Sequence, residues 1–431
     1  MISGLILIQP LSFELSIPTL RQRREKEELH KGAKVTDALH SALKTVLKMK
    51  TKIFYTPSAT GCAQRILTKM DRNWTVSIVV PVYKGGTEFR LCLEALARLA
   101  PPPLEIIVVS DGDTNSSKTA AEFNVRVIQL PRREGPARAR NVGAYNAKGD
   151  ILFFIDADVA VPPSLLHRLG EAFNAKRNLA AVIGSYDLDP AAPGIVSQYK
   201  NLLHHYVHQH SKKNADTFWG ACGAVRRDVF SLLGGFDERY RRPCVEDIEF
   251  GYRLRVAQYS IHLIRTLQVK HLKRWSFFSL LRSDIFDRAL PWTALILQYR
   301  RLSNDLNLRD SDRVSVLVVF SLISLAFMGT WTAQQHVAIV LLIALLLLLN
   351  MSLYRFFMSQ RSISFTGAAI GLHWLSFAYS GMAFIIGSAR YIGSRLYTLF
   401  LSRSLSPKGP SLDRSINSTI SGPGGPSGGE A

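Results

Sequence analysis

The sequence has little cysteine and comparatively few acidic residues. Only four cysteines occur among 431 residues, without a C-x-x-C pair or histidines at zinc spacing. This argues against a disulfide framework or zinc module and favours a reduced compartment. Aspartate and glutamate number 33 against 53 lysines and arginines, a net charge of +20. That excess predicts an anionic partner. Because zinc-finger spacing, an RNA-recognition signature and a clean recognition helix are all missing, we expect an acidic membrane surface or phosphorylated substrate and no nucleic acid.

Composition divides the chain into five predicted regions. We expect a basic, poorly ordered extension over 1–75, a catalytic domain over 76–275 and an amphipathic interfacial segment over 276–312. A transmembrane region of two to three spans is predicted over 313–392, and a disordered tail rich in Ser, Gly and Pro over 404–431. The start of the sequence lacks a basic stretch ahead of a long apolar run, so we expect no signal peptide.

Short apolar runs alternate with segments of helical spacing from residue 76 onward. The runs are continuous, as in strands buried on both faces of a parallel sheet: Val76–Tyr83, Leu104–Val109, Val125–Leu130 and Ile151–Ile155. The alternation predicts an α/β fold with a mainly parallel sheet and helices on both faces. Ligands of such sheets bind beyond the carboxyl ends of the strands. That rule selects Tyr83, Asp111 and the Asp156–Asp158 segment.

The second half of this domain has a more mixed pattern. We expect helices near 195–210 and 245–258 and strands near 218–226 and 261–269.

Three apolar segments follow, at 314–330, 336–353 and 366–386, against the roughly 20 residues that cross a bilayer. Arginines before the first segment and after the second predict a catalytic domain in the cytoplasm of an integral membrane protein, in the inner or plasma membrane. Three full spans would place the arginines after residue 389 on the opposite side. Either the third segment is re-entrant or interfacial, or the C-terminus departs from the charge rule.

Several polar residues at strand and helix ends suit a phosphate-bearing substrate. Asp156 and Asp158 form a plausible site for Mg²⁺ or Mn²⁺, which bind one or two carboxylates plus phosphate oxygens, although such pairs also cap helices. Asp111 could accept a hydrogen bond from a nucleobase or form a turn. Tyr83 could stack on a base or pack in the core. Arg140, at a helix start, could reach phosphates or lie on a solvated face.

Carboxylates and aromatics further along suit an acceptor site. Glu246 and Asp247 begin a helix, where a carboxylate could serve as general base or only complement the helix dipole. His271 and Arg274 could contact the acceptor or hold a phosphate, and Trp275 could stack on a sugar or lie at a lipid interface.

Residues 76 to about 275 resemble family 2 glycosyltransferases with the GT-A nucleotide-sugar-binding fold. The resemblance is carried by six motifs in the family's order: Ile78–Tyr83 (including Pro81), Val108–Gly112, Ala139–Asn141, Gly149–Asp158, Gly234–Glu238 and Glu246–Asp247. It implies that Tyr83 and Asp111 contact the nucleotide, that Asp156 contacts ribose or metal, and that Asp158 binds the metal. It also implies an inverting displacement, with Asp247 as base and Glu246 positioning acceptor or base.

Some positions depart from the family's pattern. Ser110 stands where a second acidic residue is frequent, and Lys84 where an asparagine is frequent. Polymerising members carry Q-x-x-R-W, and here the segment reads His271-Leu-Lys-Arg274-Trp275. The missing glutamine argues against a processive enzyme.

The function expected from the resemblance is transfer of one or a few sugars from a nucleoside diphosphate sugar, by default a UDP-sugar, to a lipid-linked or membrane-proximal glycan. A processive polysaccharide synthase and a non-catalytic nucleotide- or glycan-binding membrane subunit are the alternatives.

Overall fold

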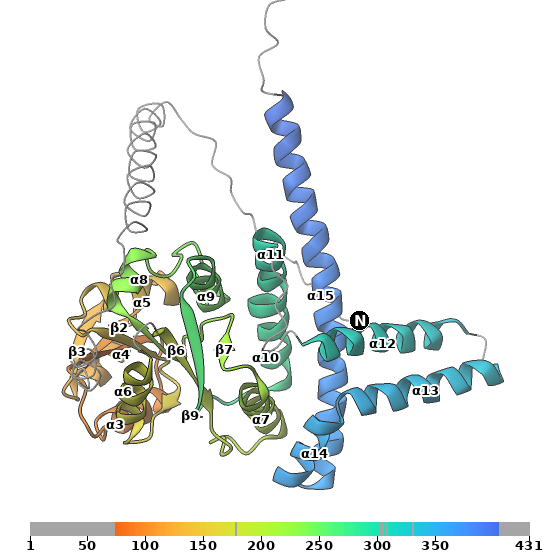
Figure 1. Ribbon diagram of the computed structural model, residues 1–431, viewed down its shortest axis with the longest axis horizontal. Coiled ribbons are helices and arrows are strands. Elements are labelled where there is room, and N and C mark those ends of the chain that lie inside the picture. The colour runs from red at the N-terminus through yellow and green to blue at the C-terminus, as the bar shows by residue number, and fades with distance from the viewer. Residues whose placement is uncertain (1–73, 177–178, 301–305, 307–308, 330–331, 405–431) are drawn as a thin grey trace, which may run out of the picture. The chain divides into compact units, whose positions relative to one another are not determined.

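The computed structural model describes residues 74–404, except 177–178, 301–305, 307–308 and 330–331. Almost all of the expected basic extension and of the expected C-terminal tail lies outside these residues. Figure 1 shows the strands gathered into one sheet with helices packed around it.

The first half of the domain alternates strictly between strand and helix. Its elements are β1 (Val76–Val82), α3 (Thr87–Leu96), β2 (Glu105–Ser110), α4 (Thr114–Ala121), β3 (Arg126–Gln129), α5 (Pro136–Tyr145) and β4 (Ile151–Ile155). β1 pairs in parallel with β2 and β4, and β2 pairs in parallel with β3. All residues of β4, and all of β1 but Pro81, are buried. The expected parallel, doubly covered sheet is therefore confirmed.

The second half adds mixed pairings to the same sheet. Its elements are β5 (Val159–Ala160), α6 (Leu165–Ala175), β6 (Leu179–Tyr186), α7 (Ile195–His210), β7 (Asn214–Ala215), β8 (Cys222–Arg226), α8 (Arg227–Leu232), α9 (Glu246–Val256) and β9 (Ser260–His271). The strand order is β3-β2-β1-β4-β8-β6-β9-β5. β8 runs antiparallel to β4 and pairs Cys222 with Ile155. Residues that precede β8 therefore lie beside the carboxyl end of β4.

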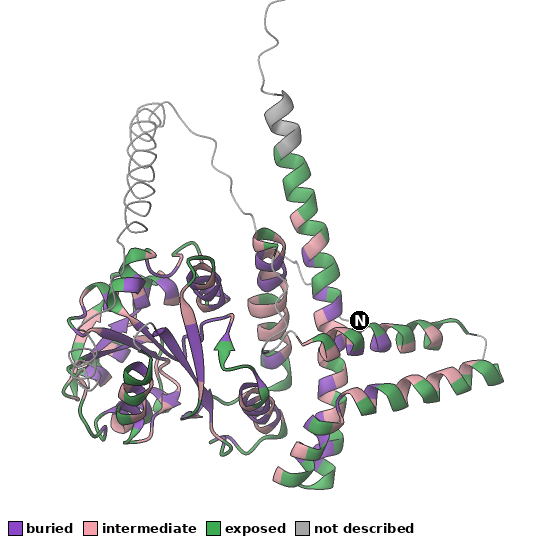
Figure 2. Cartoon of the chain, viewed as in Figure 1, coloured by how far each residue is buried: buried purple, intermediate pink, exposed green. Residues whose placement is uncertain are grey.

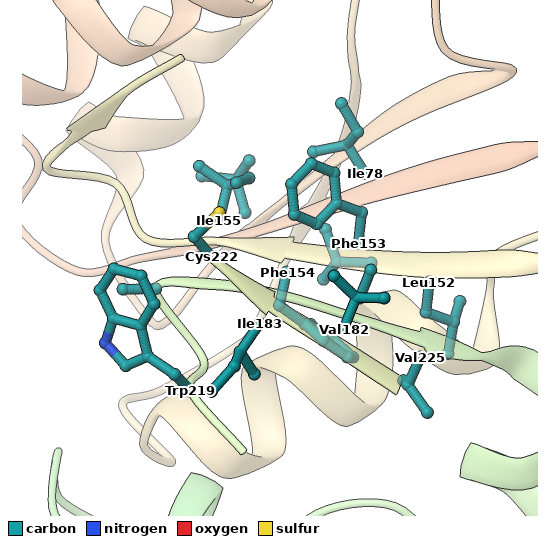
Figure 3. Close-up of a cluster of buried hydrophobic side chains, with 14 of the residues drawn as sticks. Ile78, Leu152, Phe153, Phe154, Ile155, Val182, Ile183, Trp219, Cys222 and Val225 are labelled. Carbon is teal, nitrogen blue, oxygen red and sulfur yellow. The ribbon is translucent and has the colours of Figure 1, made fainter. Parts of the chain in front are cut away.

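The core around β4 and β8 fixes that arrangement. Figure 3 shows Ile155 beside Cys222, with Phe153 and Phe154 among the buried side chains that surround them. The Phe154 ring lies 5.1 Å from that of Phe236, centroid to centroid, in an edge-to-face arrangement. Burying each such side chain contributes about 1.5–3 kcal/mol, so the sheet provides a rigid base for the strand ends.

Helices follow the sheet domain to residue 404. They are α10 (Phe277–Arg282), the π-helix η1 (Ser283–Ala289), α11 (Leu290–Tyr299), α12 (Asp310–Phe327), α13 (Ala333–Leu349), α14 (Met351–Gln360) and α15 (Ile363–Ser404). Figure 2 shows the strands largely buried, whereas α13 and residues 384–398 of α15 are largely exposed.

One described helical stretch, Ile363–Thr398 within α15, is long and apolar enough to cross a membrane. The pair α13 and α14, bent by 64°, would make a second span if it counts as one. The third expected segment thus forms the longest apolar helix. The first lies in α12, which begins with Asp310, Asp312 and Arg313 and does not qualify.

Candidate active site

A pocket of about 450 Å³ opens at the carboxyl ends of β1, β2 and β4. This volume is typical of small-molecule sites. Its lining includes most of the residues predicted from strand ends and motifs, namely Pro81, Tyr83, Asp111, Arg140, Asp156, Asp158 and Arg274. Four further predicted residues lie outside that lining: Glu246, Asp247, His271 and Trp275. Glu246 and His271 contact lining residues and Trp275 follows one in the chain, whereas Asp247 is only the neighbour of Glu246.

Asp111 organises the wall of the pocket. Its carboxylate accepts the backbone N–H groups of Glu134 at 2.6 Å and Gly135 at 2.9 Å, and it is buried. The adjacent Gly112 has a φ of 72°, and a Cβ there would lie 2.4 Å from the backbone of Arg132. Asp111 thus holds the loop before α5. Each carboxylate oxygen keeps a second acceptor site, so its contact with a nucleobase stays a prediction.

Tyr83 presents an aromatic face among cations. Its side chain is 38% exposed, and the Arg133 guanidinium lies 4.2 Å from the ring centroid. Lys84, in place of the asparagine frequent in the family, has its ammonium 5.5 Å from the same ring. A base that stacks on Tyr83 would therefore lie in a positively charged surrounding, as a nucleoside diphosphate requires.

Arg140 joins the pocket to the residues beyond it. Its Nη2 donates to Asp156 Oδ1 at 2.6 Å, and its Nη1 donates to Glu246 Oε1 at 2.8 Å. Burial opposes the charge of Arg140, yet Asp156 and Glu246 outweigh it and raise the pKa of the guanidinium. Both terminal nitrogens are thus engaged by carboxylates, and a phosphate contact by Arg140 stays a prediction. Within the described chain, its buried Nε has no hydrogen-bond partner.

Asp158 follows β4 and faces β9. Pairing of Val159 with His271 brings His271 Nε2 to 3.8 Å from Asp158 Oδ2. Burial acts to raise the pKa of Asp158, but the adjacent His271 and the charge of Lys273 outweigh it, so this pKa is lowered. The carboxylate is therefore ionised at neutral pH.

The donor set of Asp156 and Asp158 fits a hard divalent ion only together with a substrate. Both side chains are about one-third exposed and line the same pocket. The described residues contain no group of three or more His, Cys, Asp or Glu that could hold a metal. Two carboxylates plus substrate phosphate oxygens are a normal Mg²⁺ site. Because Arg140 occupies one oxygen of Asp156, Asp158 is the better candidate ligand.

Asp247 has the electrostatic properties of a general base. Burial, and then the charge of Glu246, raise the pKa of Asp247 to about 6. The N–H of Gly220, which lies before β8, donates to Asp247 Oδ2 at 2.9 Å. Glu246, by contrast, accepts from Arg140 and from the Cys244 N–H at 2.9 Å. The neighbouring carboxylates therefore differ: Glu246 is paired with the Arg140 cation, whereas Asp247 accepts from the backbone N–H groups of Gly220 and Ile248 and has a pKa of about 6.

The segment after β9 carries two predicted residues. Arg274 is exposed and lines the pocket. Trp275 is fixed to α7, because its backbone N–H donates to Ser197 Oγ at 2.8 Å. Its ring lies 4.3 Å from the Lys273 ammonium, and its buried indole Nε1 lacks a partner in the part of the chain that the structure describes.

The structure adds an aromatic group that the sequence reasoning missed. Tyr186 stacks on His271 at 4.3 Å and also contacts His204 and Trp219. The helix at 195–210 was predicted, but its inward face was not identified. The recurrence of Lys200, His204 and His208 at every fourth position is the signal that could have found it.

Residues 77–234 match the family model described as glycosyl transferase family 2. The chain therefore carries a family 2 glycosyltransferase domain, and the resemblance drawn from the motifs is confirmed. The mainly parallel sheet, with its site at the strand ends, agrees with the GT-A fold expected for such a domain.

Curated relatives match parts of the chain. An uncharacterized glycosyltransferase of Escherichia coli K12, YibD, is 34% identical over 106 residues, or 23% of this chain and 30% of that protein. The undecaprenyl-phosphate 4-deoxy-4-formamido-L-arabinose transferase of Yersinia enterocolitica is 35% identical over 183 residues, 40% of this chain and 55% of that protein. The first three relatives are matched over only 25–38% of their length.

Solved structures show weaker likeness. The mannosyltransferase PcManGT from Pyrobaculum calidifontis, in complex with GDP-Man and Mn²⁺, aligns at 16% identity with a TM-score of 0.39, covering 77% of this chain and 92% of that one. TarS from S. aureus, in complex with UDP-GlcNAc, aligns at 15% identity with a TM-score of 0.42, covering 74% and 92%.

Proposed function

We propose that this protein is an inverting, metal-dependent glycosyltransferase that moves a sugar from a nucleoside diphosphate sugar to a lipid-linked or membrane-proximal acceptor. One observation carries the proposal. The antiparallel β8 brings the segment that holds Asp247 to the carboxyl end of β4, where Asp156 and Asp158 lie. The proposal is supported by a candidate base and a candidate metal site at the same end of the sheet of a family 2 domain.

The donor would lie in the pocket at the strand ends. Tyr83 would stack on the base, and Asp111 would hold the loop that closes over it. Asp158, with Asp156 beside it, would bind Mg²⁺ or Mn²⁺, which when bound neutralises the charge that develops on the diphosphate leaving group. Lys273 and Arg274, which line the same pocket, would add positive charge near the phosphates.

The acceptor would approach from the side of Asp247. With its pKa near 6, the Asp247 carboxylate is ionised at neutral pH and can take the proton of an acceptor hydroxyl. The oxygen then attacks the anomeric carbon on the face opposite the leaving diphosphate, which inverts the configuration. Glu246 and Arg140 would keep Asp247 in place.

The helices after residue 276 would place this site at a membrane. Phe278 and Phe286, in α10 and η1, are 79% and 58% exposed, and α15 contains the apolar stretch able to span a bilayer. Aromatic side chains favour the membrane–water interface. The relative in Yersinia enterocolitica is named for an undecaprenyl-phosphate acceptor. We propose that the protein is integral to the inner or plasma membrane, with its catalytic domain in the cytoplasm.

The test is a transfer assay with the full chain in detergent. The protein would receive UDP- and GDP-sugars, Mn²⁺ or Mg²⁺, and a membrane lipid extract, with EDTA and Asp247→Asn as controls. We expect release of one nucleoside diphosphate and a lipid product of inverted configuration, both abolished by EDTA. A ladder of many sugars would favour a processive synthase. Release from no donor would favour a non-catalytic binding subunit.

A further inference from the structure

Helix α7 turns one polar face toward the site. Ser197, Lys200, His204 and His208 follow each other at intervals of three or four residues, which places them on one side of a helix. The contacts agree with that spacing: Ser197 binds the backbone of Trp275, and the His204 and His208 rings lie 4.7 and 5.1 Å from that of Trp219.

That face is linked to both candidate catalytic carboxylates through two intervening residues each. Tyr186 contacts His204 at 4.5 Å and stacks on His271, which lies 3.8 Å from Asp158. Trp219 directly precedes Gly220, whose N–H holds Asp247. The polar face of α7 is therefore connected to both the candidate metal ligand and the candidate base.

His204 and Arg288 lack a negative partner among the described residues, whereas Lys200 has one. His204 Nδ1 is buried and has no hydrogen-bond partner among the described residues. Lys200 pairs with Asp284 at 2.5 Å, but the other oxygen of Asp284 accepts the Tyr379 hydroxyl at 2.7 Å. Arg288 lies in η1. No carboxylate oxygen of a described residue lies within 4 Å of its guanidinium nitrogens, so it forms no ion pair with the described residues.

The charge of Arg288 reaches this face of α7. Burial, then the charges of His208 and Arg288, lower the pKa of His204 well below its usual value, so this histidine is neutral. The charge of Arg288 also acts on Asp247 and Tyr186. The π-helical turn that carries Arg288 is itself a feature frequent at functional sites.

The opposite face of α7 packs on apolar helices. Tyr199, Leu202 and Tyr206 form one buried cluster with side chains of α14 and α15, including Phe357 and Phe365. One helix therefore separates the candidate catalytic space from the segment able to span a membrane. A lipid lying along α14 and α15 could present its headgroup to the polar face of α7.

We propose that Lys200, His204 and Arg288 bind a phosphate monoester of the acceptor, carried on a prenyl-type lipid. His204 would donate from its unpartnered Nδ1, and Arg288 and Lys200 would balance the charge. One oxygen of the phosphate, in place of a hydroxyl, would then attack the anomeric carbon as the diphosphate leaves, and Asp247 would take the proton of the phosphate monoanion. This inference rests on the proposed function, since it names the acceptor chemistry of the same site.

Binding tests the inference separately from catalysis. Farnesyl phosphate, farnesol and inorganic phosphate would be titrated calorimetrically into the full chain in detergent, without donor. We expect farnesyl phosphate to bind about tenfold or more tightly than farnesol, because a charge-assisted hydrogen bond is lost with the phosphate. His204→Phe and Arg288→Gln should each weaken farnesyl phosphate binding about tenfold. Their affinity for nucleoside diphosphates should not change.

Matched controls lie on or next to the same elements. His210→Phe changes an exposed histidine at the end of α7, and Arg282→Gln changes an exposed arginine at the end of α10, directly before η1. Both should bind farnesyl phosphate like the unaltered protein. Inorganic phosphate that binds as tightly as farnesyl phosphate would support the phosphate site but overturn its lipid source. Equal binding of farnesol, or unchanged binding in both variants, would overturn the inference.

The transfer assay above decides the proposed function independently. Absence of transfer with every donor, alongside selective binding of farnesyl phosphate, would reject the enzyme and keep the site.

Discussion

The two halves of the candidate site are built in different ways. The nucleotide half gathers Tyr83, Asp111 and Asp156 from the ends of neighbouring parallel strands, each close in sequence to the strand that positions it. The acceptor half combines α7, the segment before β8, the start of α9 and η1, which meet only through long-range packing. A nucleotide site can thus be set by local strand ends, whereas an acceptor site depends on the whole domain.

Arg140 is the physical link between these halves. It binds Asp156 in one and Glu246 in the other, and it is almost fully buried. Each prediction below separates the halves or tests that link.

Replacing the candidate base should have the largest effect. Asp247→Asn removes the proton acceptor but keeps the side-chain shape, so we expect turnover to fall by about 10³-fold. Nucleotide affinity should stay the same, because Tyr83 and Asp158 are untouched. Steady-state rates and nucleotide titrations would measure the two effects. Asp189→Asn, at an exposed aspartate paired with Lys270, serves as the control; unchanged turnover in Asp247→Asn would move the base to Glu246.

Breaking the link should destabilise the fold. Arg140→Gln leaves Glu246 buried without its cation, which should lower the free energy of unfolding by about 3 kcal/mol. The matched change Arg138→Gln affects an exposed pair with Glu238, at 44% and 41% exposure, and should cost less than about 1 kcal/mol. Denaturant unfolding of both variants measures the difference. Equal stability of the two would contradict a structural bridge.

The pH dependence should differ between the halves. The raised pKa of Asp247, about 6, means that its base form is lost below that pH. Turnover at saturating substrate should therefore rise about tenfold between pH 5 and pH 7 and then level off. Asp158, whose pKa is lowered, stays ionised over that range, so metal-dependent nucleotide binding should change little. A turnover profile that is flat across pH 5–7 would contradict the role of Asp247.

The smallest effect should come from the aromatic face of the nucleotide half. Tyr83→Leu removes a stacking surface and should weaken nucleotide binding about fivefold, with little change in turnover at saturation. Tyr83→Phe keeps the ring and should bind normally. Calorimetric titration of a nucleoside diphosphate separates the two variants. Equal affinity of Tyr83→Leu and Tyr83→Phe would indicate that Tyr83 only packs against its neighbours.

The features that the sequence predicts, and those that it does not, follow the same division into a nucleotide half and an acceptor half. Continuous apolar runs predicted the parallel strands, and the strand-end rule placed Tyr83, Asp111, Asp156 and Asp158 in one pocket. The helix at 195–210 was predicted with its observed bounds. The role of its His204 could not be, because the contact with Tyr186 depends on where β6 and β9 lie in the sheet. The order in which strands pair in the sheet depends on the whole fold and leaves no pattern in the local sequence.

The apolar segments illustrate a second limit. Hydropathy favoured the segments at 314–330 and 336–353, yet the third forms the longest apolar helix, and the second bends at Asn350. Average hydropathy does not report where a helix begins, ends or breaks, since caps and polar side chains decide that.

The most direct test of the central claim is a titration of nucleoside diphosphates into the detergent-purified chain with Mn²⁺, with EDTA, and in the variant Asp158→Asn. We predict binding of one nucleotide that needs the metal and is weakened about 100-fold in the variant. Metal-independent binding, or an Asp158→Asn variant that binds like the unaltered protein, would contradict the assignment of this pocket as a metal-dependent nucleotide-sugar site.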